Sequence, residues 1–143
     1  MNELDNIIEV MISQHRTLQK DLGGALNSTN GDKSSADDIS NGLKQFTADL
    51  TPHLQLENEV FYPELLKRMK ASGVDTTKTE DFINQMKDVG TVVMAFLGKY
   101  KDRTNITDQL ESFKIELTGI ISALNMRIEL EEGGVYDYWE MYK

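Results

Sequence analysis

The stretch PHLQLENEVFYPEL, residues 52–65, decides the fold of this chain because it places polar residues on the buried face of a helix. Leu50, His53, Glu57 and Val60 follow one another at steps of three and four residues, the spacing of one helical face. His53 and Glu57 are one turn apart, so their side chains project from the same side. The stretch therefore predicts either a pair of metal ligands or a buried polar pair in an ordinary helix.

The same spacing predicts four long helices along the chain. They cover roughly residues 3–22, 37–70, 80–100 and 107–140, with connections rich in Gly, Ser, Asn, Asp and Thr at 23–35, 71–78 and 101–105. Four amphipathic helices with short connections are best satisfied by an antiparallel up-down-up-down bundle. We expect an all-α fold, formed by a single domain over residues 1–143.

Two positions predict local departures from a regular helix. Pro52 lies inside the second helix, where it removes a backbone donor and should kink or loosen the turn before His53. Gly133 and Gly134 lie near the end of the fourth helix, and each weakens it by on the order of 1 kcal/mol relative to alanine. We expect a break or bend there.

The composition excludes several classes of function. A formal net charge of -9 from 24 acidic and 15 basic residues repels phosphate backbones, so we expect no nucleic-acid or membrane partner. The absence of cysteine excludes thiolate metal sites and thiol nucleophiles. No apolar run approaches the roughly 18 residues of a membrane helix, and the first residues do not resemble a secretory signal. We expect a cytoplasmic protein.

Several polar residues occupy core positions of the predicted helices, namely His15, His53, Glu57, Arg127 and Glu131. These positions lie at similar heights in a bundle, so the side chains should converge. A buried carboxylate without a partner costs several kcal/mol, so each glutamate needs a cation, a donor or a proton. The chain offers two solutions, a bound metal ion or the guanidinium of Arg127.

The second and fourth helices carry related sequences. Residues 53–65, HLQLENEVFYPEL, align with residues 127–139, RIELEEGGVYDYW. The alignment pairs Leu56 with Leu130, Glu57 with Glu131, Tyr62 with Tyr136, and His53 with Arg127. Both helices therefore carry a side chain followed four residues later by a glutamate on the same face. That side chain is histidine in the second helix and arginine in the fourth.

Three stretches resemble the hemerythrin-like (HHE cation-binding) family over essentially the whole chain. They are QHRTLQKDL (14–22), HLQLENEVFYPEL (53–65) and NMRIELEEGGVYDYW (125–139). The resemblance implies a four-helix bundle that holds two non-haem irons through histidines from all four helices and bridging carboxylates. It also implies a protein that binds or senses dioxygen, stores iron or meets reactive oxygen and nitrogen species.

Carried over by position, the resemblance assigns ligand roles to His15, His53, Glu57 and Glu131. The remaining positions depart from the family pattern. Val89 or Met86 stands where the third helix normally supplies histidine, Arg127 where the fourth does, and Leu54 where a glutamate often follows the second-helix histidine. What is missing belongs to one iron, so an ordinary diiron centre cannot be assembled.

Two arrangements of this site remain. In one, Arg127 bridges Glu57 and Glu131 and the bundle holds no metal. In the other, one divalent metal, with iron the first choice, is bound by His15, His53, Glu57 and Glu131.

The preferred function is a degenerate, metal-free bundle that has lost the ordinary diiron centre and acts as a non-catalytic binding or regulatory module. The alternative is a non-haem metal protein that binds or senses oxygen or iron. An enzyme is the least favoured class, because the sequence shows no nucleophile, phosphate loop or complete redox centre. The aromatic segment YDYWEMYK, residues 136–143, either caps the bundle or serves as a surface for a protein partner or self-association.

Overall fold

The computed structural model describes residues 4–29 and 36–142, and every regular element in those ranges is a helix. The elements are α1 (Ile7–Asn27), α2 (Ala36–Gln55), η1 (Leu56–Phe61), α3 (Tyr62–Ala71), α4 (Thr77–Lys99), α5 (Arg103–Asp108), α6 (Leu110–Leu130), η2 (Glu131–Val135) and α7 (Tyr136–Tyr142), where η marks a π-helix. The predicted all-α class is confirmed.

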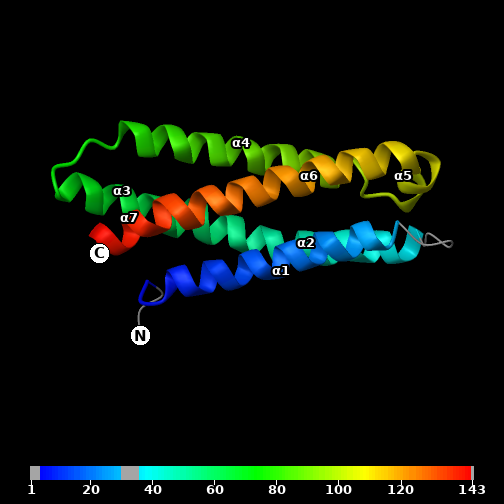
Figure 1. Cartoon of the computed structure of the whole chain (residues 1–143), viewed down its shortest axis with the longest axis horizontal. Helices are drawn as coiled ribbons and strands as arrows, with labels where there is room; N and C mark the ends of the chain where they lie inside the picture. Colours follow the sequence, from blue (N-terminus) through cyan, green and yellow to red (C-terminus); the bar gives the residue numbers. More distant parts are fainter. Residues whose placement is uncertain (1–3, 30–35, 143) are drawn as a thin grey trace.

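The helices form four long rods that run side by side (Figure 1). One rod is α1, the second is the continuous run α2-η1-α3, the third is α4 and the fourth is α6-η2-α7. Helix α1 packs against α2 and α6, and α4 packs against α6. The chain therefore folds as the predicted up-down-up-down bundle. Within the described ranges, no helix is both long enough and apolar enough to cross a bilayer.

Helices extend into two of the predicted connections among the described residues. Helix α1 continues through Gly23 and Gly24 to Asn27, because Ala25 is buried and extends the apolar face of the helix. The short helix α5 overlaps the predicted connection at 101–105, so that prediction was wrong. The side chain of Asp102 caps α5 by accepting a hydrogen bond from the backbone N–H of Thr104, at 2.9 Å.

The connection between the second and third rods begins at Gly73, whose φ of 78° lies in the left-handed region. The N–H of Val74 donates to the carbonyl of Met69 at 3.2 Å, and the N–H of Gly73 donates to that of Lys70 at 3.0 Å. These two bonds form a Schellman motif, in which glycine is the favoured residue at the left-handed position. The motif ends α3 and lets the chain turn back into α4.

The departures from α-helical geometry occur at the two related sequences. Helix α2 runs through Pro52 to Gln55, and the π-helical segment η1 begins only at Leu56. The bend expected at Gly133 and Gly134 takes the form of the π-helical segment η2. In each segment a tyrosine N–H donates to a glutamate carbonyl five residues earlier, Tyr62 to Glu57 and Tyr136 to Glu131.

This wider turn decides which side chains share a face. In an α-helix, the side chains of residues i and i+5 point in clearly different directions, because five residues make well over one turn. In a π-helix, the hydrogen bond from residue i+5 to residue i closes a wider turn, so these two side chains lie on nearly the same face. Tyr62 is therefore stacked one turn beyond Glu57, and Tyr136 one turn beyond Glu131. Each π-helical segment turns a glutamate and a tyrosine toward the centre of the bundle.

The apolar core is divided into two clusters of buried residues. One contains Leu18, Leu50, Val93 and Leu124, and the other contains Met11, Phe61, Met86 and Val135. On every rod, the members of the two clusters are separated by the positions where the sequence turns polar or small. The polar residues therefore form a layer between two apolar cores.

The aromatic C-terminal segment closes the second cluster. Tyr136 and Trp139 are buried, and the ring of Trp139 packs against Phe61 with a centroid distance of 5.2 Å. The guanidinium of Arg68 lies 4.3 Å from the centre of the Trp139 ring. These contacts agree with the capping role among the two expected roles. Lys143, the last residue of the segment, lies outside the described residues.

Candidate metal centre

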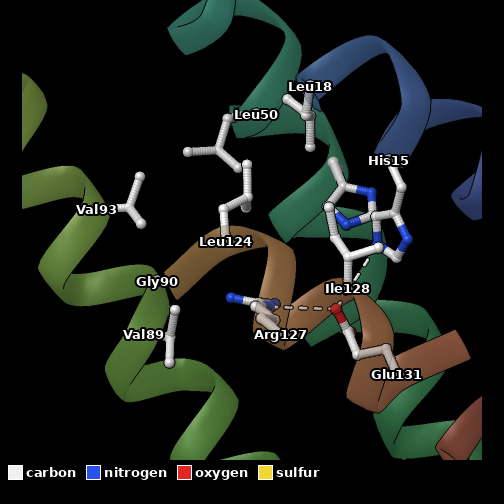
Figure 2. A pocket seen from close by; sticks show the side chains of 11 residues that line it. His15, Leu18, Leu50, Val89, Gly90, Val93, Leu124, Arg127, Ile128 and Glu131 are labelled. Atoms are coloured by element: carbon white, nitrogen blue, oxygen red, sulfur yellow. Dashed lines mark hydrogen bonds and ion pairs between the residues drawn. The ribbon is translucent and has the colours of Figure 1, made fainter. Parts of the chain in front are cut away.

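The predicted ligand residues converge in the polar layer. His15 comes from α1, His53 from α2, Glu57 from η1 and Glu131 from η2. All four are buried, and one potential ligand atom from each lies within 4.8 Å of the others. Figure 2 shows His15 and Glu131 on one side of the layer, with Arg127 beside them. The four residues could hold a metal ion.

Imidazole nitrogens face carboxylate oxygens across this group. The Nε2 atom of His53 lies 3.2 Å from Oε2 of Glu57. The Nε2 atom of His15 lies 3.6 Å from Oε1 of Glu131 and 4.0 Å from Oε2 of Glu57. The potential ligand atoms of these residues therefore point into one small space.

The other nitrogen of each imidazole is held by an acceptor. Nδ1 of His15 lies 2.8 Å from a carboxylate oxygen of Glu132, and Nδ1 of His53 lies 2.7 Å from Oε1 of Gln14. These oxygens accept but do not donate, so each Nδ1 carries the proton. Each Nε2 atom is then unprotonated and presents a lone pair, unless the ring holds a second proton. Such partners orient the histidine ligands of metal sites.

Arg127 contributes a permanent positive charge to the layer. It is 3 % exposed and donates from Nη2 to Oε1 of Glu57, from Nε to Oε1 of Glu131 at 3.2 Å, and from Nη1 to the carbonyl of Met86 at 2.8 Å. It therefore bridges the two glutamates. It does so through Oε1 of Glu57, whereas the imidazole of His53 faces Oε2.

The third rod meets Arg127 through its backbone. A Cβ atom added to Gly90 would lie 3.1 Å from Nη1 of Arg127, so the absence of a side chain there makes room for the guanidinium. The sequence predicted Val89 or Met86 at this point. Met86 contributes only its carbonyl, and Val89 lines the small pocket beside Arg127 (Figure 2).

Two tyrosines complete the layer. The hydroxyl of Tyr62 donates to Oε2 of Glu131 at 2.7 Å and lies 3.3 Å from Oε1 of Glu57. The hydroxyl of Tyr136 lies 3.2 Å from Nε2 of His15 and 3.4 Å from Oε2 of Glu57. The internal alignment pairs these tyrosines, and their shared position five residues after a glutamate was the available signal for a site role.

The buried environment shifts the pKa values of these groups in different directions. Burial, followed by the charge of His53, lowers the pKa of His15 to about 4, although Glu132 and Glu57 act in the opposite direction. Burial and the neighbouring charge of Glu57 raise the pKa of Glu131 well above its ordinary value. Burial alone would also raise the pKa of Glu57, but hydrogen bonds with Glu131 and His53 and the charge of Arg127 lower it.

Without a metal, burial therefore favours the neutral forms of His15 and Glu131, whereas Arg127 favours the ionised form of Glu57. Two imidazole nitrogens and one or two carboxylate oxygens form a set that suits iron, zinc or manganese. A metal ion in this space would be bound by the histidine nitrogens and carboxylate oxygens that otherwise face each other. It would displace a proton held by Glu131. The residues fit one metal ion.

Comparison with known proteins gives one match. The family model for the hemerythrin HHE cation-binding domain matches residues 6–139, which include every residue of the polar layer. No curated protein and no solved structure shows a significant match to the chain.

Proposed function

Because the chain belongs to the hemerythrin HHE cation-binding family, we propose that it binds one divalent metal ion through His15, His53, Glu57 and Glu131. Iron is the ion that we propose, since the family's ordinary centre holds iron and the donor set accepts it. The second iron of that centre has no counterpart in this proposal, because the guanidinium of Arg127 already supplies a positive charge to both carboxylates.

A single observation carries this proposal. Nε2 of His53 lies 3.2 Å from Oε2 of Glu57, while Nδ1 of the same ring is held by Gln14. Two acceptors at hydrogen-bond distance in a buried site repel unless a positive charge lies between them. A metal ion supplies that charge and also binds the facing nitrogen of His15, which a proton on His53 would not do.

The limit to one ion follows from charge and from donors. Only two histidines are present in the sequence, and both serve the same side of the layer. The guanidinium of Arg127 contacts Oε1 of Glu57, which faces neither imidazole, Oε1 of Glu131, which also faces His15, and the carbonyl of Met86. A second divalent ion there would face a buried cation a few ångströms away, an unfavourable arrangement at low dielectric.

The biological role that we propose is a non-catalytic module that binds or senses iron or dioxygen. Two histidines and two carboxylates leave coordination positions of an iron ion open, which is the chemistry that such sensing requires.

A metal-free module is the second candidate, and Arg127 favours it. Its guanidinium bridges Glu57 and Glu131, so the two carboxylates are satisfied without an ion. In that state a proton must lie between His53 and Glu57. A metal-free module needs no ligand at this site. It does not explain why the Nε2 atoms of two imidazoles point into the same space.

Metal titration separates the two candidates. Chelator-treated protein is titrated anaerobically with ferrous iron, and the content after desalting is measured by mass spectrometry. One ion per chain is expected for the natural sequence, and loss of binding is expected for the double variant His15→Ala/His53→Ala. Lys20→Ala, at an exposed position on α1, is the control and should keep its ion. If the natural chain retains no transition metal, the metal-free candidate is correct.

A further inference from the structure

The placement of Tyr136 differs from that of its counterpart Tyr62. The hydroxyl of Tyr136 lies 3.2 Å from Nε2 of His15 and 3.4 Å from Oε2 of Glu57. Both of these atoms belong to the group that faces the central space. The side chain is buried, with 2 % of its surface exposed, and its ring stacks on His15 at a centroid distance of 5.7 Å.

Tyr62 contacts the opposite side of the carboxylates. Its hydroxyl donates to Oε2 of Glu131 at 2.7 Å and lies 3.3 Å from Oε1 of Glu57, the oxygen that Arg127 also contacts. Neither of these oxygens faces an imidazole nitrogen in the structure. Tyr62 therefore supports the outer oxygens of the carboxylates, whereas Tyr136 lies among the inner atoms.

We propose that Tyr136 is a ligand of the bound iron in its ferric state, an inference that rests on the proposed single-metal site. A phenolate oxygen is a hard anionic donor of the kind that trivalent iron prefers, and tyrosine serves as an iron ligand in other protein sites. Together with Glu57 and Glu131, it provides three anionic ligands that match the three positive charges of the ferric ion, beside the single positive charge of Arg127.

Ferrous iron loses one electron to an added oxidant such as ferricyanide, the O–H bond of Tyr136 breaks, and an iron–oxygen bond forms. The phenolic proton leaves to solvent, as protons do when metals bind to protonated ligands. In the absence of a metal, burial and the charges of Glu131 and Glu57 raise the pKa of Tyr136, and a bound cation reverses the effect of those charges.

The π-helical segment η2 is what makes this geometry available. The N–H of Tyr136 donates to the carbonyl of Glu131, so the tyrosine is carried one turn beyond the glutamate on the same face. A regular α-helix would rotate Tyr136 away from that face. The glycines at 133 and 134 leave no side chain beside this turn: a Cβ at either position would meet no other atom within 4 Å.

Optical and resonance Raman spectra of iron-loaded protein test the proposal. The natural chain and the variants Tyr136→Phe, Tyr62→Phe and Tyr100→Phe are loaded with one equivalent of ferrous iron, oxidised with ferricyanide and desalted. A phenolate ligand gives a visible charge-transfer band and phenolate ring modes enhanced within it. We expect both in the natural chain and in the control Tyr100→Phe, whose ring lies in the apolar cluster with Leu124, and the loss of both in Tyr136→Phe at equal iron content. Tyr62→Phe, which removes a hydrogen bond to Glu131, should keep the phenolate ring modes.

The outcomes are distinguishable from failure of the proposed function. Iron bound to the natural chain without the visible band overturns the Tyr136 ligand and leaves the single-metal site intact. Absence of bound iron overturns both. If Tyr136→Phe does not fold, as circular dichroism would show, the spectrum of Tyr62→Phe decides: loss of its phenolate ring modes at equal iron content assigns the phenolate to Tyr62 and overturns the proposal.

Discussion

Nε2 of His53 lies 3.2 Å from Oε2 of Glu57, and the guanidinium of Arg127 contacts the other oxygen of the same carboxylate. Each of the two carboxylate oxygens of Glu57 therefore needs a positively charged partner. Arg127 is that partner for Oε1, and Oε2 needs a proton or a metal ion. The predictions below test each part of this arrangement.

Glu132 should control metal affinity without contacting the ion. Its carboxylate lies 2.8 Å from Nδ1 of His15 and also accepts a hydrogen bond from Arg16, so it holds the imidazole with Nε2 toward the site. Loss of such a partner lowers metal affinity by roughly 10-fold to 100-fold in other sites. We expect Glu132→Ala to show a decrease of this size in competition with a chromogenic chelator.

The matched control for this experiment is Glu129→Ala, on the exposed side of the same rod. It removes the same charge from the protein and should leave the affinity unchanged. An equal decrease in both variants would mean that net charge, and not the orientation of His15, sets the affinity.

Arg127 should be required for the stability of the metal-free protein. Its removal leaves the ionised Glu57 buried without its cation, and breaking a buried ion pair on one side costs roughly 3 kcal/mol. We expect Arg127→Ala to lower the free energy of unfolding by about this amount in urea titrations with chelator present. A decrease below about 0.5 kcal/mol, the size of an ordinary surface substitution, would contradict the account.

Arg103→Ala supplies the comparison for that result. Arg103 pairs with Asp37, but both side chains are mainly exposed, at 60 % and 68 %. Solvent screens an exposed ion pair of this kind, so this variant should unfold almost as the natural chain does.

Gly90→Ala should be destabilising, in contrast to alanine at another helical glycine. The added Cβ would lie 3.1 Å from Nη1 of Arg127, and hydrogen bonds to Met86, Glu57 and Glu131 hold that guanidinium in place. We expect a lower free energy of unfolding, because the hydrogen bonds of Arg127 are weakened. The measurement is chemical denaturation of the metal-free protein.

Gly119 provides the matched substitution. A Cβ there meets no atom within 4 Å, so Gly119→Ala should stabilise α6 by up to about 1 kcal/mol through helix propensity alone. Equal stabilisation by Gly90→Ala would show that Arg127 can move aside at no cost, and would remove Gly90 from the site.

Asp21 should make stability depend on pH at a distance from the metal residues. Burial, followed by its hydrogen bond and charge interaction with Asp49, raises the pKa of Asp21 from 3.8 to about 6. A raised pKa means that the folded state holds this proton more tightly than the unfolded state. The stabilisation is fully present below pH 3.8 and is lost as the pH rises through about 6.

Asp21→Asn removes this dependence, because an amide keeps a donor toward Asp49 at every pH. Relative to the natural chain, the variant should gain in melting temperature as the pH rises from about 5 to about 7. Asp88→Asn, on the exposed face of α4, should show no such trend. A difference between Asp21→Asn and the natural chain that is the same at both pH values would contradict the prediction.

The periodicity of the sequence was sufficient for the bundle and for the convergence of its polar layer. His15, His53, Glu57, Arg127 and Glu131 occupy core positions of amphipathic helices, and rods packed side by side bring equal heights together. The short helix α5 was missed because it depends on the cap at Asp102 and on the burial of Ile106, a single apolar residue.

The remaining parts of the site depend on features that periodicity does not contain. The π-helical segments shift the register by one residue, so Tyr62 and Tyr136 reach the layer from positions that an α-helical wheel places elsewhere. Gly90 acts through an absent side chain, and Gln14 and Glu132 act through neighbouring imidazoles. Such roles are visible only once the opposing helices are in place.

We propose that one metal ion and one arginine together occupy the polar layer. X-ray diffraction from crystals of iron-loaded protein, recorded on both sides of the iron absorption edge, tests it most directly. The account predicts one anomalous peak among His15, His53, Glu57 and Glu131, with Arg127 still bonded to the carbonyl of Met86. Two peaks, or no peak with the guanidinium alone between the carboxylates, would contradict it.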